Sequence, residues 1–561
     1  MTETVSAPPA RALDGLWRRQ LGHYPETGPR VMYLAIVVLA TIILYYELYI
    51  AGAVSPSIIA GYGMTFPFYV YISVVGNAVG AFGSLAAGLG DRWGRANMVA
   101  YGLLVTGALT LFGIPNASGK WTFAVLFAAI GLVEGVILVA TPALVRDFSP
   151  QLGRASAMGF WTLGPVVGSL VVAVVSSNTL NHLHAWQDQF VICGIAGLIV
   201  GVIALFGLRE LAPGLRDQLM VSLHDRALIE ARARGIDIAE SLRHPWRQMM
   251  RLDVIGSAFA IAVFLLIYYT AVGFFTVFFT TLHGFSLSTA NSIGNWFWGF
   301  DALALIVVGV ISDRIGVRKP FMVIGGVGAI VMTIVFLNLG ASTSYGTFAL
   351  VISILAVFLA IAYAPWMASF TETVEKHNPA LTATGLAVWG WIIRAVIAIS
   401  IFILPSVVSS MTPLVTYGTQ VSTLSAKYAP ELATLKAIDP KTVAALQANP
   451  ADTAAATTAV GEIATTFKVS PAVATSKLTA LATVPKSDLL FLNEHGESVI
   501  TAAATAPGQW KDWWWVCVGG EVVFLPFILV MTGRWSPKKA REDAVEHERL
   551  VDEALADLQK Q

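Results

Sequence analysis

The 561-residue sequence contains little charge and little cysteine. Only 12% of its residues are Asp, Glu, Lys or Arg, compared with about 25% in soluble globular proteins. The two cysteines, Cys193 and Cys517, both lie inside apolar runs. This placement excludes a disulfide framework and a cysteine-rich metal site, so we interpret both as packing residues. Hydrophobic residues make up 56% of the chain and its mean hydropathy is +0.69, which predicts a protein that crosses a membrane several times.

Signals for several other classes of protein are also missing. The formal net charge is zero and the basic residues are scattered over loops, so no nucleic-acid-binding surface is indicated. There is no Gly-x-x-x-x-Gly-Lys-Ser/Thr loop, which argues against a transport ATPase. No His/Asp/Glu or Ser/His constellation has useful spacing within the apolar runs, so we do not expect an enzyme and expect no cofactor. Residues 1–30 lack an apolar core followed by a cleavage site and are interpreted as a cytoplasmic tail.

Twelve stretches are apolar enough over about 20 residues to cross a bilayer as helices. They are 31–53, 67–90, 97–115, 122–145, 157–178, 190–208, 254–281, 289–311, 321–339, 347–371, 386–410 and 512–532. The expected fold is therefore all-α and membrane-integral, with two six-helix bundles. The expected domains are an N-terminal bundle at 31–208, a cytoplasmic linker at 209–253, spans 7–11 at 254–410, an insert at 411–511, span 12 at 512–532 and an amphipathic cytoplasmic tail at 533–561.

The distribution of basic residues predicts the orientation of the spans. Arginines are concentrated in the N-terminal tail, in the linker and in the loops after spans 2, 4 and 8, whereas the short loops on the opposite side offer only Lys120. Because cytoplasmic loops carry an excess of Lys and Arg, both termini are expected in the cytoplasm, with the protein in the plasma (inner) membrane. We expect a monomer whose partners are a small-molecule substrate and the lipid bilayer.

The insert at 411–511 is too polar to enter the membrane and too long for a plain loop. Segments 429–438, 440–447 and 472–482 have helix-compatible spacing of Leu, Val and Ala. We expect a small helical cap on the extracytoplasmic side, which could bind a partner. The alternative is a loosely ordered linker, since aromatic residues for a core are few.

A short charged element occurs twice, as Asp91-Arg92-Trp93-Gly94-Arg95 and as 313–319, each between long apolar runs. The repetition indicates a duplicated half, as in transporters whose two bundles rock against each other. A carboxylate at the membrane edge can cap the N-terminus of a neighbouring helix and pair with arginine. Such contacts would hold a cytoplasmic gate closed. The alternative is that these charges only set the topology.

Twelve spans, the repeated element and a long central linker together resemble the major facilitator superfamily. In the second copy Gly309, Asp313, Arg314 and Gly316 fit the loop signature of that family, whereas Ala87 replaces the leading glycine in the first copy. The resemblance implies that Asp91 meets the start of span 11 at residues 382–385. It also implies gate residues in the runs 146–154 and 372–379. The expected gate residues are Asp91, Arg92, Gly94, Arg95, Arg146, Asp313, Arg314, Gly316, Arg318 and Glu372.

A weaker resemblance lies in span 5, where Gly164-Pro165-Val166-Val167-Gly168 is similar to an element of proton-coupled drug antiporters. Small residues also allow helices to approach closely, so helix packing is the alternative.

Few charged residues lie in the interior of the predicted spans, and they are Glu47, Glu134, Asp301, Arg394 and Glu521. Such residues are costly in a membrane and are therefore candidates for function. Glu47, Glu134 and Asp301 are the candidates for proton coupling. Glu47 is the first of these, because its position resembles that of the span 1 carboxylate in several proton symporters of the superfamily. Structural hydrogen bonding is its alternative. Asp301 and Arg394 could form an ion pair, and Glu521 is expected to be structural.

Aromatic, amide and cationic residues of the spans complete the predicted substrate cavity. The candidates are Tyr45, Tyr49, Asn77, Tyr268, Tyr269, Asn295, Trp298, Tyr363, Trp389 and Arg394. A mixed aromatic and charged cavity suits a moderately polar organic solute. The sequence therefore predicts a proton-coupled symporter or antiporter of a small metabolite or drug-like solute, working by alternating access. The alternatives are a nontransporting receptor or scaffold that uses the insert, and a transporter of a lipid-like substrate.

Overall fold

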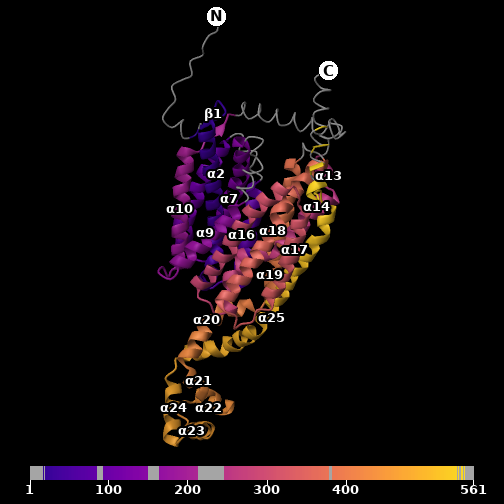
Figure 1. Ribbon diagram of the computed structural model, residues 1–561. Helices are drawn as coiled ribbons and strands as arrows, with labels where there is room; N and C mark the ends of the chain where they lie inside the picture. The colour runs from indigo at the N-terminus through magenta and orange to yellow at the C-terminus, as the bar shows by residue number, and fades with distance from the viewer. Residues whose placement is uncertain are drawn as a thin grey trace. The chain divides into compact units, whose positions relative to one another are not determined.

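The structure is a computed structural model that describes residues 19–84, 93–149, 163–212, 245–377 and 382–539, with a few further positions near each end. Almost all of these residues are helical (Figure 1). The chain divides into two compact units, Met1–Val407 with Trp510–Gln561, and Val408–Gln509. Most of the predicted linker and parts of the loops after spans 2, 4 and 10 lie outside the described residues.

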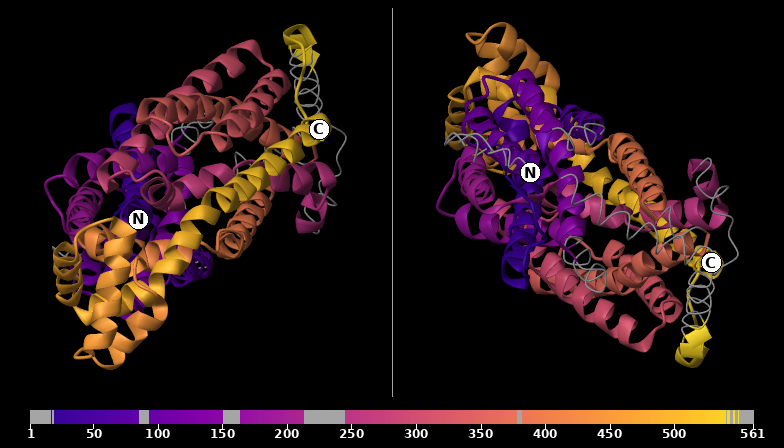
Figure 2. Two further views of the ribbon diagram at one scale, coloured as in Figure 1. Left: turned by 90° about the horizontal axis from the view of Figure 1, so that it is seen from below. Right: turned by 90° about the horizontal axis from the view of Figure 1, so that it is seen from above.

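The larger unit contains two groups of helices, called here the first and second halves. The first half comprises α2 (Thr27–Ala53), α3 (Ser55–Gly61), α4 (Phe66–Ser84), α6 (Arg95–Ala108), α7 (Lys120–Phe148), α9 (Gly164–Thr179) and α10 (Trp186–Gly207). The second half comprises α13 (Pro245–Met249), α14 (Leu252–Phe264), α15 (Leu266–Leu282), α16 (Leu287–Ile315), α17 (Lys319–Leu337), α18 (Tyr345–His377), α19 (Thr382–Val407) and the part of α25 (Lys486–Val530) from Trp510 onward. Figure 2 shows these helices from the two ends of the bundle.

Eleven stretches of described helix are long and apolar enough to cross a membrane, counting 252–282 as one. Helix α9 is apolar but has only 16 residues, and residues 157–162 of the predicted fifth span lie outside the described part. The structure therefore confirms an all-α membrane fold, while the number twelve stays a prediction.

Two irregularities interrupt helices that the sequence predicts as continuous. Predicted span 7 breaks at Leu265 between α14 and α15, although no proline or glycine occurs there. Predicted span 3 changes after Ala108 into a π-helical turn, Leu109–Gly113, and a 3₁₀ turn, Ile114–Asn116. The second change has a local cause, because Pro115 has no N–H to continue the helical hydrogen bonds.

Small residues bring helices of the first half into close contact. A side chain on Gly135 of α7 would place its Cβ 2.0 Å from the carbonyl oxygen of Gly80 on α4. A Cβ on Gly168 of α9 would lie 2.6 Å from the Cβ of Tyr45 on α2. The glycine of the antiporter-like element is therefore required for packing of α9 against α2.

A short parallel pairing joins the start of the chain to the segment after α10. Strand β1 (Gln20–Leu21) pairs with β2 (Glu210–Leu211). Residues 1–30 are expected to form a tail, but at least residues 19–21 are part of the packed first half. Helix α2 also begins at Thr27, four residues earlier than expected.

Hydrogen bonds join the two halves at the end of the bundle where α2 terminates, called here the far end; α2 begins at the near end. The Ser288 hydroxyl of α16 donates to the Ser177 carbonyl of α9 at 2.6 Å. The Asn291 amide donates to the Ala53 carbonyl of α2 at 2.9 Å, and the Asn295 amide donates to the Ser177 hydroxyl at 3.1 Å. The halves are thus in direct contact at the far end.

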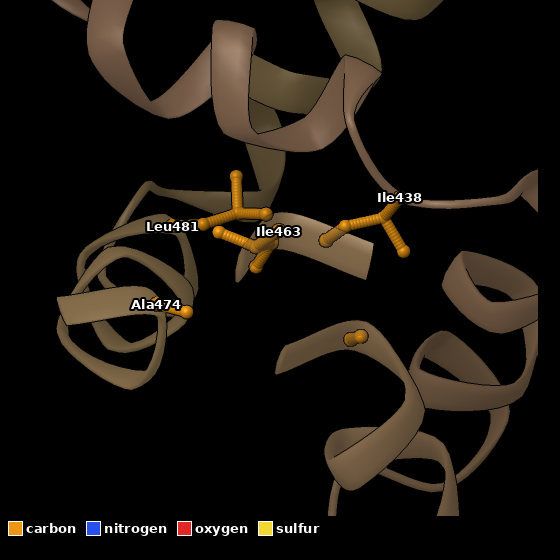
Figure 3. Close-up of a cluster of buried hydrophobic side chains, with 5 residues drawn as sticks. Ile438, Ile463, Ala474 and Leu481 are labelled. Carbon is orange, nitrogen blue, oxygen red and sulfur yellow. The ribbon is translucent and has the colours of Figure 1, made fainter. Parts of the chain in front are cut away.

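The smaller unit consists of helices, including α20 (Met411–Lys427), α21 (Ala429–Lys436), α22 (Pro440–Ala448), α23 (Thr453–Phe467) and α24 (Pro471–Ala482). Three of these helices occupy the segments expected to be helical in the insert. One core cluster is aliphatic, with Ile438, Ala459, Ile463, Ala474 and Leu481 packed together (Figure 3). A second cluster contains Leu424, Tyr428 and Val484, with Phe491 packed against it. Helix α25 begins within this unit and continues to Val530 without the break that the sequence suggests before residue 512.

Candidate functional site

Five tyrosines predicted to line a cavity come together between the two halves. Tyr45 and Tyr49 lie on α2, with ring centroids 5.4 Å apart, and Tyr268 and Tyr269 lie on α15, 5.7 Å apart. Tyr363 on α18 interacts electrostatically with Tyr45, and Tyr269 interacts with Tyr363, Tyr49 and Tyr45. All five side chains keep part of their surface accessible, although they lie among three helices of both halves. Of the five, Tyr49 and Tyr269 line a cavity within the larger unit.

Two glutamates of the first half face a small cavity next to these tyrosines. Glu47 on α2 and Glu134 on α7 are 3% and 2% exposed. Both line a cavity of about 140 Å³ together with Asn77, Tyr49 and Tyr269, and the two carboxyl groups interact electrostatically. None of their four carboxyl oxygens has a hydrogen-bond partner. An ionised carboxylate without donors is costly in such a place, so these groups require a proton, a cation or a polar ligand.

The immediate surroundings of Glu47 are tight. A Cβ on Gly197 of α10 would lie only 1.9 Å from Glu47 Oε1, so only glycine at this position leaves room for the carboxyl group. The Thr106 hydroxyl of α6 lies beside the carboxyl group but donates to the Leu103 carbonyl at 3.3 Å. Cys193, which is buried on α10, also lies near Glu47.

Asp301 and Arg394 lie on two different helices of the second half. Asp301 on α16 is 3% exposed and interacts electrostatically with Tyr268 and Tyr363. Arg394 on α19 is exposed, and its guanidinium interacts with Tyr45 of the opposite half.

The remaining predicted cavity residues lie close to the same space. The Trp298 ring is 4.8 Å from that of Tyr268. Trp389 on α19 packs near Trp366, and its buried indole N–H has no hydrogen-bond partner. Asn77 donates to the Ser73 carbonyl at 2.9 Å on the cavity wall. Asn295 takes part in the far-end contact between the halves.

In the first copy of the repeated element, Gly94 and Arg95 are described, whereas Asp91 and Arg92 lie outside the described residues. Gly94 has φ +86°, a conformation that favours glycine, and begins α6. The backbone N–H of Arg95 donates to Glu210 at 2.6 Å, and its guanidinium forms an ion pair with Asp147 of α7 at 2.7 Å. The side chain of Arg146 lies outside the described part. The expected contact of Asp91 with residues 382–385 also involves a residue outside it.

In the second copy, predicted gate residues assemble around Arg318. This guanidinium lies 2.6 Å from Asp313 and 3.2 Å from Glu372 of α18. Gly316 ends α16 in the left-handed conformation, with φ 72°. Arg314 is exposed. These near-end ion pairs, like that of Arg95, each stay within one half.

Sequence reasoning missed a buried arginine at the near end. Arg19 is 2% exposed; its guanidinium donates to the carbonyls of Ala204 and Leu205 at the end of α10, at 2.9 and 2.7 Å, and to the Ala96 carbonyl. Two further bonds, at 3.0 and 2.7 Å, go to Asn97 Oδ1. Burial lowers the pKa of Arg19 from its usual value, but an arginine in proteins stays charged. A polar Asn97 early in a predicted span is the one signal that could have suggested this contact.

Glu521, interpreted as structural from the sequence, lies in the second half on α25. It is fully buried and accepts a hydrogen bond from the Thr333 hydroxyl of α17 at 2.7 Å. One of its oxygens is therefore satisfied within the protein, in contrast to those of Glu47 and Glu134.

Comparisons with known proteins agree with this architecture. A sequence profile described as "Major Facilitator Superfamily" matches residues 37–402 of the chain. The chain is 27% identical over 315 residues to the glycine betaine/proline/ectoine/pipecolic acid transporter OusA of Dickeya dadantii (strain 3937), covering 53% of this chain and 59% of that relative. It is 25% identical over 393 residues to an MFS-type efflux pump of Mycolicibacterium smegmatis, covering 64% and 78% of the two chains.

Solved structures show the same fold. A bacterial homologue of the human lysosomal transporter Spinster, in an inward-facing and occupied conformation, matches with a TM-score of 0.53 and 15% identity over 93% of this chain and 99% of that one. A D-xylose–proton symporter matches with a TM-score of 0.50 and 13% identity over 66% and 96%. Since the profile covers more than half of the sequence, the chain belongs to the Major Facilitator Superfamily of membrane transporters.

Proposed function

We propose that the protein is a proton-coupled secondary active transporter of a small organic solute that works by alternating access. The observation that carries this proposal is the pair Glu47 and Glu134, two buried carboxyl groups without hydrogen-bond partners that face one cavity. A carboxyl group in this position can take up a proton when the cavity opens to one side and release it when the cavity opens to the other.

The contacts between the halves support alternating access. At the far end Ser288, Asn291 and Asn295 of α16 bind backbone and side-chain groups of the first half. At the near end the ion pairs of Arg95 and Arg318 each lie within one half. The far-end contacts are of the kind that one state of an alternating-access cycle makes and the other breaks. We place both termini in the cytoplasm and the protein in the inner membrane, because the arginine distribution predicts it.

The direction of transport is left to experiment, because the relatives differ. One is named as a transporter of glycine betaine and related compounds and another as an efflux pump, and the match spans only 59% of the first relative's length. Both names are those of transporters. We propose that the protein acts as a monomer.

The proposal is tested with the full chain in proteoliposomes. Solutes from a metabolite and drug panel are offered with and without an imposed pH gradient. We expect at least one solute to accumulate above its equilibrium level only when the gradient is present, and a protonophore to abolish the accumulation. If no solute moves under any gradient, the proposal is wrong and a receptor or scaffold is favoured. Movement of labelled lipid alone would favour a lipid-like substrate.

A further inference from the structure

We propose that the cavity at Glu47 and Glu134 binds a compact organic cation, whose ammonium group lies at the two carboxyl groups and the Thr110 hydroxyl of the first half and whose apolar body lies against α15 and α19 of the second half. This inference rests on the proposed function, since it names the substrate class of the same cavity.

The first half supplies the polar end of the cavity. Glu47 on α2 and Glu134 on α7 line it, and none of their carboxyl oxygens has a hydrogen-bond partner. Thr110 also lines the cavity; it is 1% exposed, and its hydroxyl has no partner either. Buried polar groups without partners are costly, so three such groups on one cavity indicate a ligand with hydrogen-bond donors. An ammonium group supplies N–H donors and no acceptor.

Thr110 lies in an irregular part of the backbone. In a regular helix a threonine hydroxyl commonly donates to a carbonyl one turn earlier, as Thr41 does to Val37 at 2.8 Å. Thr110 lies in the π-helical turn Leu109–Gly113 and makes no such bond. Turns of this kind inside helices are frequent at functional sites. The hydroxyl is therefore available to a ligand in the cavity.

The second half supplies an apolar wall with room beside it. Val272 and Phe274 of α15 and Ile397 and Ile401 of α19 line the cavity. Gly273 lines it too, and a Cβ at this position would have no other segment of the protein within 4 Å. One water molecule needs about 10–15 Å³ and a drug-sized ligand about 300–1,000 Å³, whereas this cavity holds about 140 Å³. A compact ligand with a few carbon atoms fits this space.

This composition selects for a cation with a hydrocarbon body. No Lys, Arg or His occurs among the described residues that line the cavity, so an organic anion would face two carboxyl groups without a counter-charge. A solute with many hydroxyl groups would place some of them against the apolar wall without partners. Tyr49 and Tyr269 also line the cavity, and tyrosine ring faces attract ammonium groups.

Four small molecules test the inference at neutral pH. Cyclohexylammonium has both the charge and the apolar ring, cyclohexanol has the ring without charge, cyclohexanecarboxylate has the ring with the opposite charge, and methylammonium has the charge without the ring. Their binding to the purified full chain in detergent is measured by isothermal titration calorimetry, with displacement titrations for weak ligands and no ion gradient. We expect cyclohexylammonium to bind roughly tenfold or more tightly than each of the others, a difference of about 1.4 kcal/mol.

Three variants separate the two ends of the ligand. Glu134→Gln is expected to weaken cyclohexylammonium to the level of cyclohexanol and to leave cyclohexanol unchanged, which also shows that the variant is folded. Thr110→Val is expected to weaken both ammonium ions several-fold. Gly273→Val fills the room beside the apolar wall, so it should weaken cyclohexylammonium roughly tenfold and leave methylammonium unchanged.

Two matched controls should alter none of the four affinities. Glu521→Gln changes another buried glutamate, which does not line this cavity. Gly461→Val changes another helical glycine, which is exposed on α23 and has no other segment within 4 Å of its Cβ position.

The inference is overturned if cyclohexanol or cyclohexanecarboxylate binds as tightly as cyclohexylammonium, if none of the four molecules binds, or if cyclohexylammonium keeps its affinity in Glu134→Gln or Gly273→Val. These results would leave proton coupling intact, because the proposed function fails only when no solute responds to a pH gradient. Conversely, selective binding of cyclohexylammonium without gradient-driven flux of any solute would retain the cation site and reject the coupling.

Discussion

Replacing Glu47 with glutamine is expected to abolish accumulation driven by a pH gradient while leaving exchange of labelled for unlabelled solute across the membrane. Glutamine keeps nearly the same volume between α2, α6 and α10, where Gly197 leaves room for the side chain. It cannot take up or release a proton, so transport loses its link to the gradient. The ratio of inside to outside solute concentration reached in proteoliposomes should fall by roughly tenfold or more, and a tenfold change in such a ratio corresponds to about 1.4 kcal/mol.

Glu521→Gln is the matched control for this experiment. Glu521 is also a buried glutamate, but it accepts a hydrogen bond from Thr333 in the second half and does not line the cavity at Glu47. Gradient-driven uptake by this variant should stay close to that of the unmodified protein. Unchanged uptake by Glu47→Gln, or equal losses in both variants, would remove Glu47 from the coupling mechanism.

Replacing Arg19 with glutamine is expected to destabilise the first half strongly. Arg19 donates five hydrogen bonds, to the carbonyls of Ala204, Leu205 and Ala96 and to the Asn97 side chain. Glutamine is shorter and has only two donors, so several buried acceptors would lose their partners. Each unsatisfied buried group costs about 1–3 kcal/mol, which suggests a total loss of roughly 3 kcal/mol after local relaxation.

A thermal unfolding scan of the full chain in detergent measures this effect. The midpoint temperature of Arg19→Gln should fall by several degrees, whereas that of Arg247→Gln, an exposed arginine, should change little. An unchanged midpoint for Arg19→Gln would mean that the N-terminal segment does not dock on α6 and α10.

The fold could be predicted because its main determinant is the length of apolar runs. Helices such as α7 and α16 exceed 25 residues and contain few charges, and in a membrane such a run has no alternative to a helix. Details set by tertiary contacts were not predictable. The break at Leu265 has no local signal, and docking of Arg19 depends on carbonyls some 185 positions away.

The sequence could predict which residues belong to the candidate site, but not which of them lie close together. The cost of burying charge identifies Glu47, Glu134, Asp301 and Arg394 from the sequence alone. Which of them lie together depends on helix rotation, and the structure places Glu47 with Glu134 and Arg394 with Tyr45, while Asp301 lies beside Tyr268. An ion pair between Asp301 and Arg394 stays a prediction, because positions on separate helices do not determine how those helices are rotated.

The most direct test of alternating access is a reversible cross-link at the far end. Ser177 on α9 and Ser288 on α16 are in hydrogen-bond contact across the halves, so we expect cysteines at both positions to form a disulfide, while the native Cys193 and Cys517 are buried. Oxidation of the double variant should stop gradient-driven flux, and a reducing agent should restore it, because the halves must separate at this end to open the cavity to the other side. Full flux with the cross-link formed would contradict the account.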